Sequence, residues 1–119
     1  MDLFPSDALF IVSTNNLAFA KEQVPQEGRR VFFLENEPPY IDFYTLTLCK
    51  HAIISNSTFG WWAAYLNTHP GKVVVCPKIW LFKGKPNIEL ATKHPQLYPQ
   101  EYPDVYPPDW IQIDASPIF

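Results

Sequence analysis

The chain has 119 residues and a formal net charge of −3, with nine lysines and arginines against twelve aspartates and glutamates. This length predicts one domain, and a hydrophobic fraction of 47% supplies a core and excludes wholesale disorder. The acidic balance argues against nucleic-acid binding, and no apolar run reaches the roughly 20 residues that cross a membrane.

Short apolar runs alternate with helical segments over the first two-thirds of the chain. The runs predict strands at residues 9–12, 30–34, 52–55 and 73–76, and the segments between them predict helices at 17–24, 40–50 and 57–66. Asn15 or Asn16 is placed to cap the first helix. In the second helix, the spacing of Ile41, Tyr44 and Leu48, and then of Leu46 and Cys49, predicts a buried face.

The strands are continuously apolar, which favours a parallel sheet covered by helices on both faces. We therefore predict an α/β, Rossmann-like core over residues 1–79. Nine of the thirteen prolines lie between residues 70 and 119, and several of them recur every four residues behind tyrosines. One interpretation is a proline-motif ligand. We favour an irregular tail, rich in proline and aromatic residues, over residues 80–119, packed on the same domain, with residues 110–113 as a short strand or extended segment.

The most informative window follows the third predicted strand and opens the third helix. Free backbone N–H groups, hydroxyls and the helix dipole at this position favour an anion. A glycine in the first turn lets a ligand approach the backbone. The candidate binding residues of this window are Asn56, Ser57, Thr58, Phe59 and Gly60. The alternative is simple capping by Ser57, with Trp61 and Trp62 in the core; a core Trp62 predicts a loss of roughly 3–5 kcal/mol on Trp62→Ala.

Asp42 lies in the first turn of the second predicted helix. A carboxylate at this position accepts two parallel N–H donors of the kind that a guanine edge offers. The alternative is a purely structural role, because a helix N-terminus stabilises any nearby carboxylate. His51, His69 and His94 have no partners at the spacing of a catalytic triad or a metal site, and two cysteines are too few for a zinc site, so we predict no metal.

The segment from Ile41 to Asn67 resembles the α-1,2-fucosyltransferases, which belong to glycosyltransferase family 11. The similar stretches read "LCKH", "NSTFGWW" and "AAYLN". The segments at residues 10–16, 72–78 and 108–111 are also similar to that family, so the resemblance covers nearly the whole chain.

This resemblance implies that the chain is one half of a GT-B-like fold, the half that holds most of the donor nucleotide. Family members transfer L-fucose from GDP-fucose to the 2-hydroxyl of a terminal galactose, with inversion and without a required metal or other cofactor. The implied partners are GDP-fucose and, through an N-terminal half absent from this chain, a β-galactoside acceptor. Ser57 and Thr58 would contact the diphosphate, Asp42 the guanosine side, and Asn15 and Asn16 the donor cleft.

The chain departs from the family at the basic signature His-x-Arg-Arg-x-Asp, whose arginines hold the phosphates. The only adjacent arginines are Arg29 and Arg30, and Glu27 and Phe32 stand where the pattern needs His and Asp. We therefore expect a donor-binding portion that is inactive by itself, with no catalytic residue identified. The alternatives are a non-catalytic module that binds a sugar nucleotide or a protein, and a flavodoxin-like regulatory domain, which the lack of an acidic cluster after the first strand disfavours. Animal relatives are anchored in the Golgi and bacterial ones are cytoplasmic, so the compartment stays open.

Overall fold

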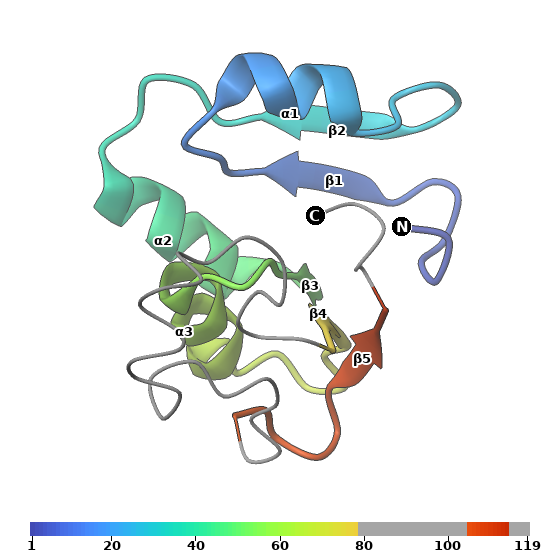
Figure 1. The fold of residues 1–119 in the computed structure, drawn as a ribbon, viewed down its shortest axis with the longest axis vertical. Coiled ribbons are helices and arrows are strands. Elements are labelled where there is room, and N and C mark those ends of the chain that lie inside the picture. Colours follow the sequence, from blue (N-terminus) through green and yellow to red (C-terminus); the bar gives the residue numbers. More distant parts are fainter. Residues whose placement is uncertain (79–104, 115–119) are drawn as a thin grey trace, which may run out of the picture.

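The computed structural model describes residues 1–78 and 105–114. Their elements follow in chain order as β1 (Leu9–Val12), α1 (Leu17–Gln23), β2 (Arg30–Phe33), α2 (Pro39–Leu48), β3 (Ala52–Ile53), α3 (Thr58–Leu66), β4 (Val74–Pro77) and β5 (Ile111–Ile113). All strand pairs are parallel, and this confirms a small α/β fold with three helices in the described part (Figure 1). The expected domain boundary at residue 79, and most of the proline-rich tail, lie outside the described residues.

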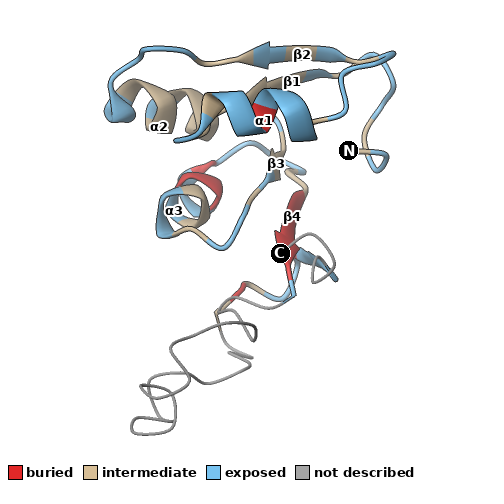
Figure 2. Cartoon of the chain, turned by 45° about the horizontal axis from the view of Figure 1, so that its top comes forward, coloured by how far each residue is buried: buried red, intermediate tan, exposed pale blue. Residues whose placement is uncertain are grey.

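The strands form two sheets, where the sequence pattern predicted one. The first sheet pairs β1 with β2, and the second has the order β3-β4-β5. The single sheet was therefore a wrong prediction. Apolar residues show that a segment is a strand, but they carry no information on which strand lies beside it. Coverage on both faces was also too broad an expectation, because β4 alone is buried along its whole length (Figure 2).

The helices begin where the local sequence favours a start. Asn16 caps α1, since its Oδ1 accepts a hydrogen bond of 3.1 Å from the backbone N–H of Phe19. Pro39 is the first residue of α2, and proline is tolerated there because its missing N–H has no partner within a helix. Asn67 ends α3, as the sequence predicted.

The buried face expected for α2 is wrong at two of its five positions. Tyr44 and Leu48 are both exposed and, with Tyr40, form an exposed stripe along the outer side of the helix. Ile41, Leu46 and Cys49 are partly buried, as predicted. The helix α2 packs against α3 through the edge-to-face contact of Phe43 with Phe59. The helical spacing was right, but two apolar stripes compete on this helix and only packing decides which of them turns inward.

The core lies between α3, β4 and the segment that leads into β5. Its buried members are Ala64, Val74, Cys76, Tyr106 and Trp110. Burial raises the pKa of the Cys76 thiol to about 11. The segment before β5 is attached by Tyr106, whose hydroxyl donates a hydrogen bond of 2.7 Å to the carbonyl of Pro77. Residues 105–114 are thus part of the folded unit, and the expected terminal strand is confirmed as β5.

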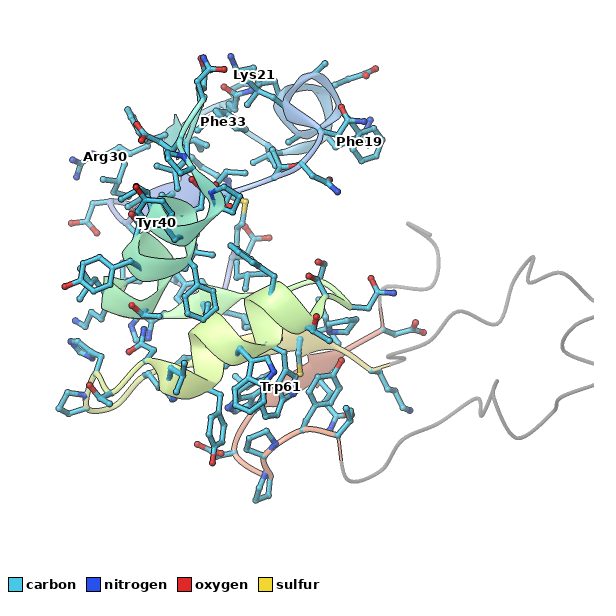
Figure 3. All side chains as sticks on the ribbon, turned by 90° about the vertical axis from the view of Figure 1, so that its left-hand side faces the viewer. Phe19, Lys21, Arg30, Phe33, Tyr40 and Trp61 are labelled. Atoms are coloured by element: carbon cyan, nitrogen blue, oxygen red, sulfur yellow. The ribbon has the colours of Figure 1, made fainter. Side chains whose placement is uncertain are left out.

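Trp61 and Trp62 lie in different surroundings. The indole of Trp61 packs against the core and donates a hydrogen bond of 2.9 Å to the carbonyl of Val105 (Figure 3). Trp62 is 51% exposed. The expectation that both tryptophans are core residues is therefore wrong for Trp62, since consecutive residues on a helix are about 100° apart and only one of them faces the core.

The turn between α2 and β3 contains a histidine whose neutral form is part of the fold. His51 Nδ1 accepts a hydrogen bond of 2.9 Å from the backbone N–H of Val73, which it can do only when it is unprotonated. Desolvation, followed by the charges of Lys50 and His69, lowers the pKa of His51. The folded chain therefore binds fewer protons at this site than the unfolded chain, and stability rises with pH in that range.

We expect the contribution of His51 to the free energy of unfolding to be constant above about pH 6.5. Below that pH, the contribution should fall as the pH drops. Urea unfolding at a series of pH values between 7 and 5 measures this decline. The variant His51→Ala should lose the His51 part of the decline, whereas His69→Ala should keep it. An identical pH profile in His51→Ala and the unmodified chain would contradict the assignment.

Candidate functional site

The carboxyl end of β1 and the first turn of α2 are joined by a direct hydrogen bond. Ser13, which follows β1, donates from its Oγ to Asp42 Oδ2 over 2.7 Å. Asp42 reaches this position because the helix that follows β2 returns toward the end of β1. Sequence reasoning missed Ser13 as a site residue. Its position in the sequence could have identified it, because a polar residue directly after a parallel strand lies at the edge where open α/β sheets bind ligands.

The second oxygen of the same carboxylate has no hydrogen-bond partner among the described residues. Among the described residues, Asp42 Oδ1 is the one buried side-chain oxygen or nitrogen that makes no hydrogen bond. Buried polar atoms in folded proteins are almost always paired, and an unpaired acceptor carries a desolvation cost of about 1–3 kcal/mol. The site therefore holds an acceptor to which a donor from outside the described residues would bind favourably.

The N-terminus of α3 follows β3, and Asn56 and Thr58 beside it are exposed. Ser57 has extended backbone dihedral angles, and its carbonyl accepts from the N–H of Trp61 over 3.0 Å. Its side chain makes no capping hydrogen bond, so the alternative of simple capping by Ser57 is wrong. The first N–H groups of a helix have no partner within it, and the helix dipole places a partial positive charge there.

Phe59 and Gly60 have packing roles beside this helix N-terminus. The ring of Phe59 meets Phe43 edge to face, with centroids 5.3 Å apart, and this contact sets α3 beside the helix that carries Asp42. A Cβ on Gly60 would lie 3.4 Å from Cβ of Ile54, so glycine allows α3 to sit close to the end of β3. Both residues thus position the backbone of the site.

The three asparagines of the predicted site differ in whether their side chains make hydrogen bonds within the protein. Asn16 caps α1, so its Oδ1 is already engaged. Asn15 and Asn56 are both exposed, and each follows the end of a strand. The structure therefore brings Asp42 together with Ser13, and it leaves Asn15 and Asn56 free to turn toward a ligand.

A surface hollow of about 440 Å³ lies along β2 and the residues that follow it. Lys21 and Phe33 lie together in it, with the Lys21 ammonium 5.9 Å from the ring centre and paired with Glu35 (Figure 3). None of the predicted site residues lines the hollow. Its lining residues are Lys21, Val31, Phe32, Phe33, Leu34, Glu35 and Glu37.

Residues 1–78 and 105–114 offer neither a metal-binding cluster nor a membrane span. They contain no group of three or more histidine, cysteine, aspartate or glutamate side chains placed to hold a metal ion. None of their helices has the length and apolar character of a membrane span.

Parallel strands, with polar residues and helix N-termini at their carboxyl ends, define an α/β protein, and open α/β sheets in general bind ligands at this edge. The model of glycosyl transferase family 11 matches residues 1–111, and the chain belongs to that family.

Individual relatives are similar over part of the chain. O-antigen biosynthesis glycosyltransferase WbnK of Escherichia coli is 33% identical over 76 residues, which cover 62% of this chain and 25% of WbnK. Galactoside alpha-(1,2)-fucosyltransferase 2 of Bos taurus is 41% identical over 64 residues, 51% of this chain and 19% of that enzyme. Galactoside alpha-(1,2)-fucosyltransferase 1 of Homo sapiens is 38% identical over 61 residues, which cover 49% of this chain and 17% of that enzyme. The matched part of this chain thus spans a quarter or less of these relatives, and no solved structure matches it.

Proposed function

We propose that this chain is the donor-nucleotide portion of an α-1,2-fucosyltransferase, one Rossmann-like half of a GT-B-like enzyme, and that it binds GDP-fucose. The observation that carries the proposal is the unpaired, buried Oδ1 of Asp42 beside Ser13. Guanine presents adjacent N–H donors on one edge, and a carboxylate accepts such a pair in parallel. Adenine lacks this pair of donors, so the same group would make the site selective for guanosine.

The diphosphate is assigned to the N-terminus of α3. The hydroxyls of Ser57 and Thr58 and the free N–H groups of the first turn are all donors, and an anion is favoured there. During fucosyl transfer the bond from the sugar to GDP breaks and negative charge grows on the departing phosphate. Donors that are already in place stabilise that charge without reorganising.

We assign no catalytic base to this chain. The site residues Asn15, Asn16, Asp42 and Asn56–Gly60 include no lysine or arginine. The cations that would neutralise the diphosphate, and the β-galactoside acceptor site, are assigned to the larger part of the enzyme that relatives carry outside the matched region. On this proposal the chain binds the donor and does not transfer fucose by itself.

Calorimetric titration with GDP, GDP-fucose and ADP tests the donor assignment. We expect weak binding of GDP and GDP-fucose and weaker binding of ADP, because the carboxylate accepts from the guanine edge. The double variant Ser57→Ala/Thr58→Ala should bind GDP more weakly. It should keep the unfolding midpoint of the unmodified chain, because Ser57 makes no capping hydrogen bond whose loss would cost stability.

Two outcomes would redirect the proposal. Equal affinity for GDP and ADP, or no binding of either, would remove the donor assignment and favour the second candidate, a non-catalytic module that binds a protein. The absence of the His-x-Arg-Arg-x-Asp signature is the observation that favours this candidate. Full GDP affinity in the double variant would place the diphosphate away from α3.

A further inference from the structure

The two sheets leave room in the strand order for one further strand between β1 and β3. In the sheets β2-β1 and β3-β4-β5 all pairs are parallel, and β1 and β3 are not hydrogen-bonded to each other. The usual Rossmann sheet has the order 3-2-1-4-5-6. Without its first strand, this order splits into 3-2 and 4-5-6. When the five remaining strands are renumbered along the chain, these become 2-1 and 3-4-5, the order found here. We propose that one further parallel strand, supplied from outside residues 1–119, inserts between β1 and β3.

The backbone edges that face the interval are unpaired among the described strands. Leu34 N–H donates to Val12 O, so Val12 points its backbone groups at β2, and those of Ile11 point to the opposite side. Ile54 N–H donates to Val75 O, so by the same alternation the backbone groups of Ile53 point away from β4. Exposed strand edges are normally paired with another strand, covered, or protected by charged side chains. Ile11 and Ile53 are apolar, and no described strand pairs with the edges on which they lie.

Side-chain contacts connect the two sheets on either side of the interval. At the amino ends, the ring of Phe4 lies between Phe10 and His51, with centroid distances of 6.2 and 5.3 Å. At the carboxyl end of β1, the hydrogen bond from Ser13 to Asp42 joins β1 to α2, which packs on α3. One inserted strand needs about 10 Å between its neighbours, which is two strand spacings.

The occupant is the segment that precedes the equivalent of β1 in the longer relatives. The missing strand is the first of the six in the Rossmann order, so it comes before β1 along the chain. WbnK has the length to supply it, since the matched part of this chain covers 25% of that protein. A strand buried between two others in a parallel sheet is apolar on both faces. Its carboxyl end would emerge beside Ser13 and Asp42.

Hydrogen–deuterium exchange tests the insertion directly. The probe is a synthetic peptide of the WbnK sequence that immediately precedes the equivalent of β1, and the control is a scrambled peptide of the same composition. We expect the probe to slow exchange of the Ile11 and Ile53 amides about tenfold or more, and the scrambled peptide to leave them unchanged. The outer-edge amides of β2, Val31 and Phe33, should not change.

A matched pair of proline variants locates the strand independently. Ile11→Pro removes an N–H that faces the interval, and Phe33→Pro removes one that faces outward from β2. We expect the first to weaken peptide binding about tenfold or more and the second to leave it unchanged. No protection at Ile11 and Ile53, protection at Val31 and Phe33 instead, or equal effects of the two prolines would each overturn the proposal. GDP binding is not part of these readouts, so they are independent of the donor assignment.

Discussion

Replacing Trp110 by alanine will lower the free energy of unfolding by about 3–5 kcal/mol. Trp110 is 6% exposed and immediately precedes β5. Its ring packs against Trp61 and Tyr106, with centroid distances of 5.5 and 6.0 Å. Truncation to alanine removes the buried apolar surface of the indole ring and leaves a cavity between α3 and β4. Urea unfolding followed by circular dichroism measures the loss.

Trp62→Ala is the matched control, since Trp62 has the same side chain on the exposed side of α3. We expect it to cost about 1 kcal/mol, because Trp62 touches only Trp61 and Tyr65 among the aromatic residues described. Trp110→Phe, which keeps part of the packing, should fall between the two variants. This milder variant gives a value even if Trp110→Ala does not fold. Equal losses in Trp110→Ala and Trp62→Ala would contradict the placement of the core.

Replacing Asp42 by asparagine will weaken GDP binding by about 1.5–3 kcal/mol, which is roughly 10- to 100-fold in Kd. The substitution keeps the size of the side chain but removes its charge. It also places an amide donor against one of the N–H donors of guanine. ADP binding should change little, so the ratio of GDP to ADP affinity falls. Calorimetric titration of both nucleotides measures the two effects together.

Ser13→Ala separates ligand recognition from the internal contact of the carboxylate. It removes the hydrogen bond to Asp42 Oδ2 and leaves the carboxylate charged, so GDP selectivity should survive. Unchanged GDP affinity in Asp42→Asn would show that the carboxylate serves only to join α2 to the end of β1. The structural role stated for a carboxylate in the first turn of a helix would then be sufficient.

Local sequence patterns predicted the elements well, for reasons that act over a few residues. Apolar runs closed by polar residues gave β1, β2 and β4 within about one residue, and Asn16 caps its helix as expected. The window from Asn56 to Gly60 was selected as a candidate because a strand directly followed by a helix places N–H groups at one edge. Proline at the start of α2 and Asn67 at the end of α3 act in the same local way.

Facing directions were less well predicted, because they depend on what packs opposite. On α2, either apolar stripe satisfies the helical spacing, and contact with α3 through Phe43 leaves Tyr44 outside. On α3, Trp61 and Trp62 are equivalent in composition, and only the first meets Trp110. Such choices are settled by long-range contacts whose partners are separated by tens of residues along the chain.

The sequence by itself determined the family, the α/β class and the residues at the strand ends, since each of these is written in short, contiguous stretches. The tertiary structure alone decided that the strands divide into two sheets, because strand pairing depends on backbone hydrogen bonds that side chains do not encode. It alone also brought Ser13 to Asp42, 29 positions apart in the chain, and left one buried carboxylate oxygen without a donor. Both features arise where distant segments meet, and both lie on the side where a further strand and a nucleotide are proposed to bind.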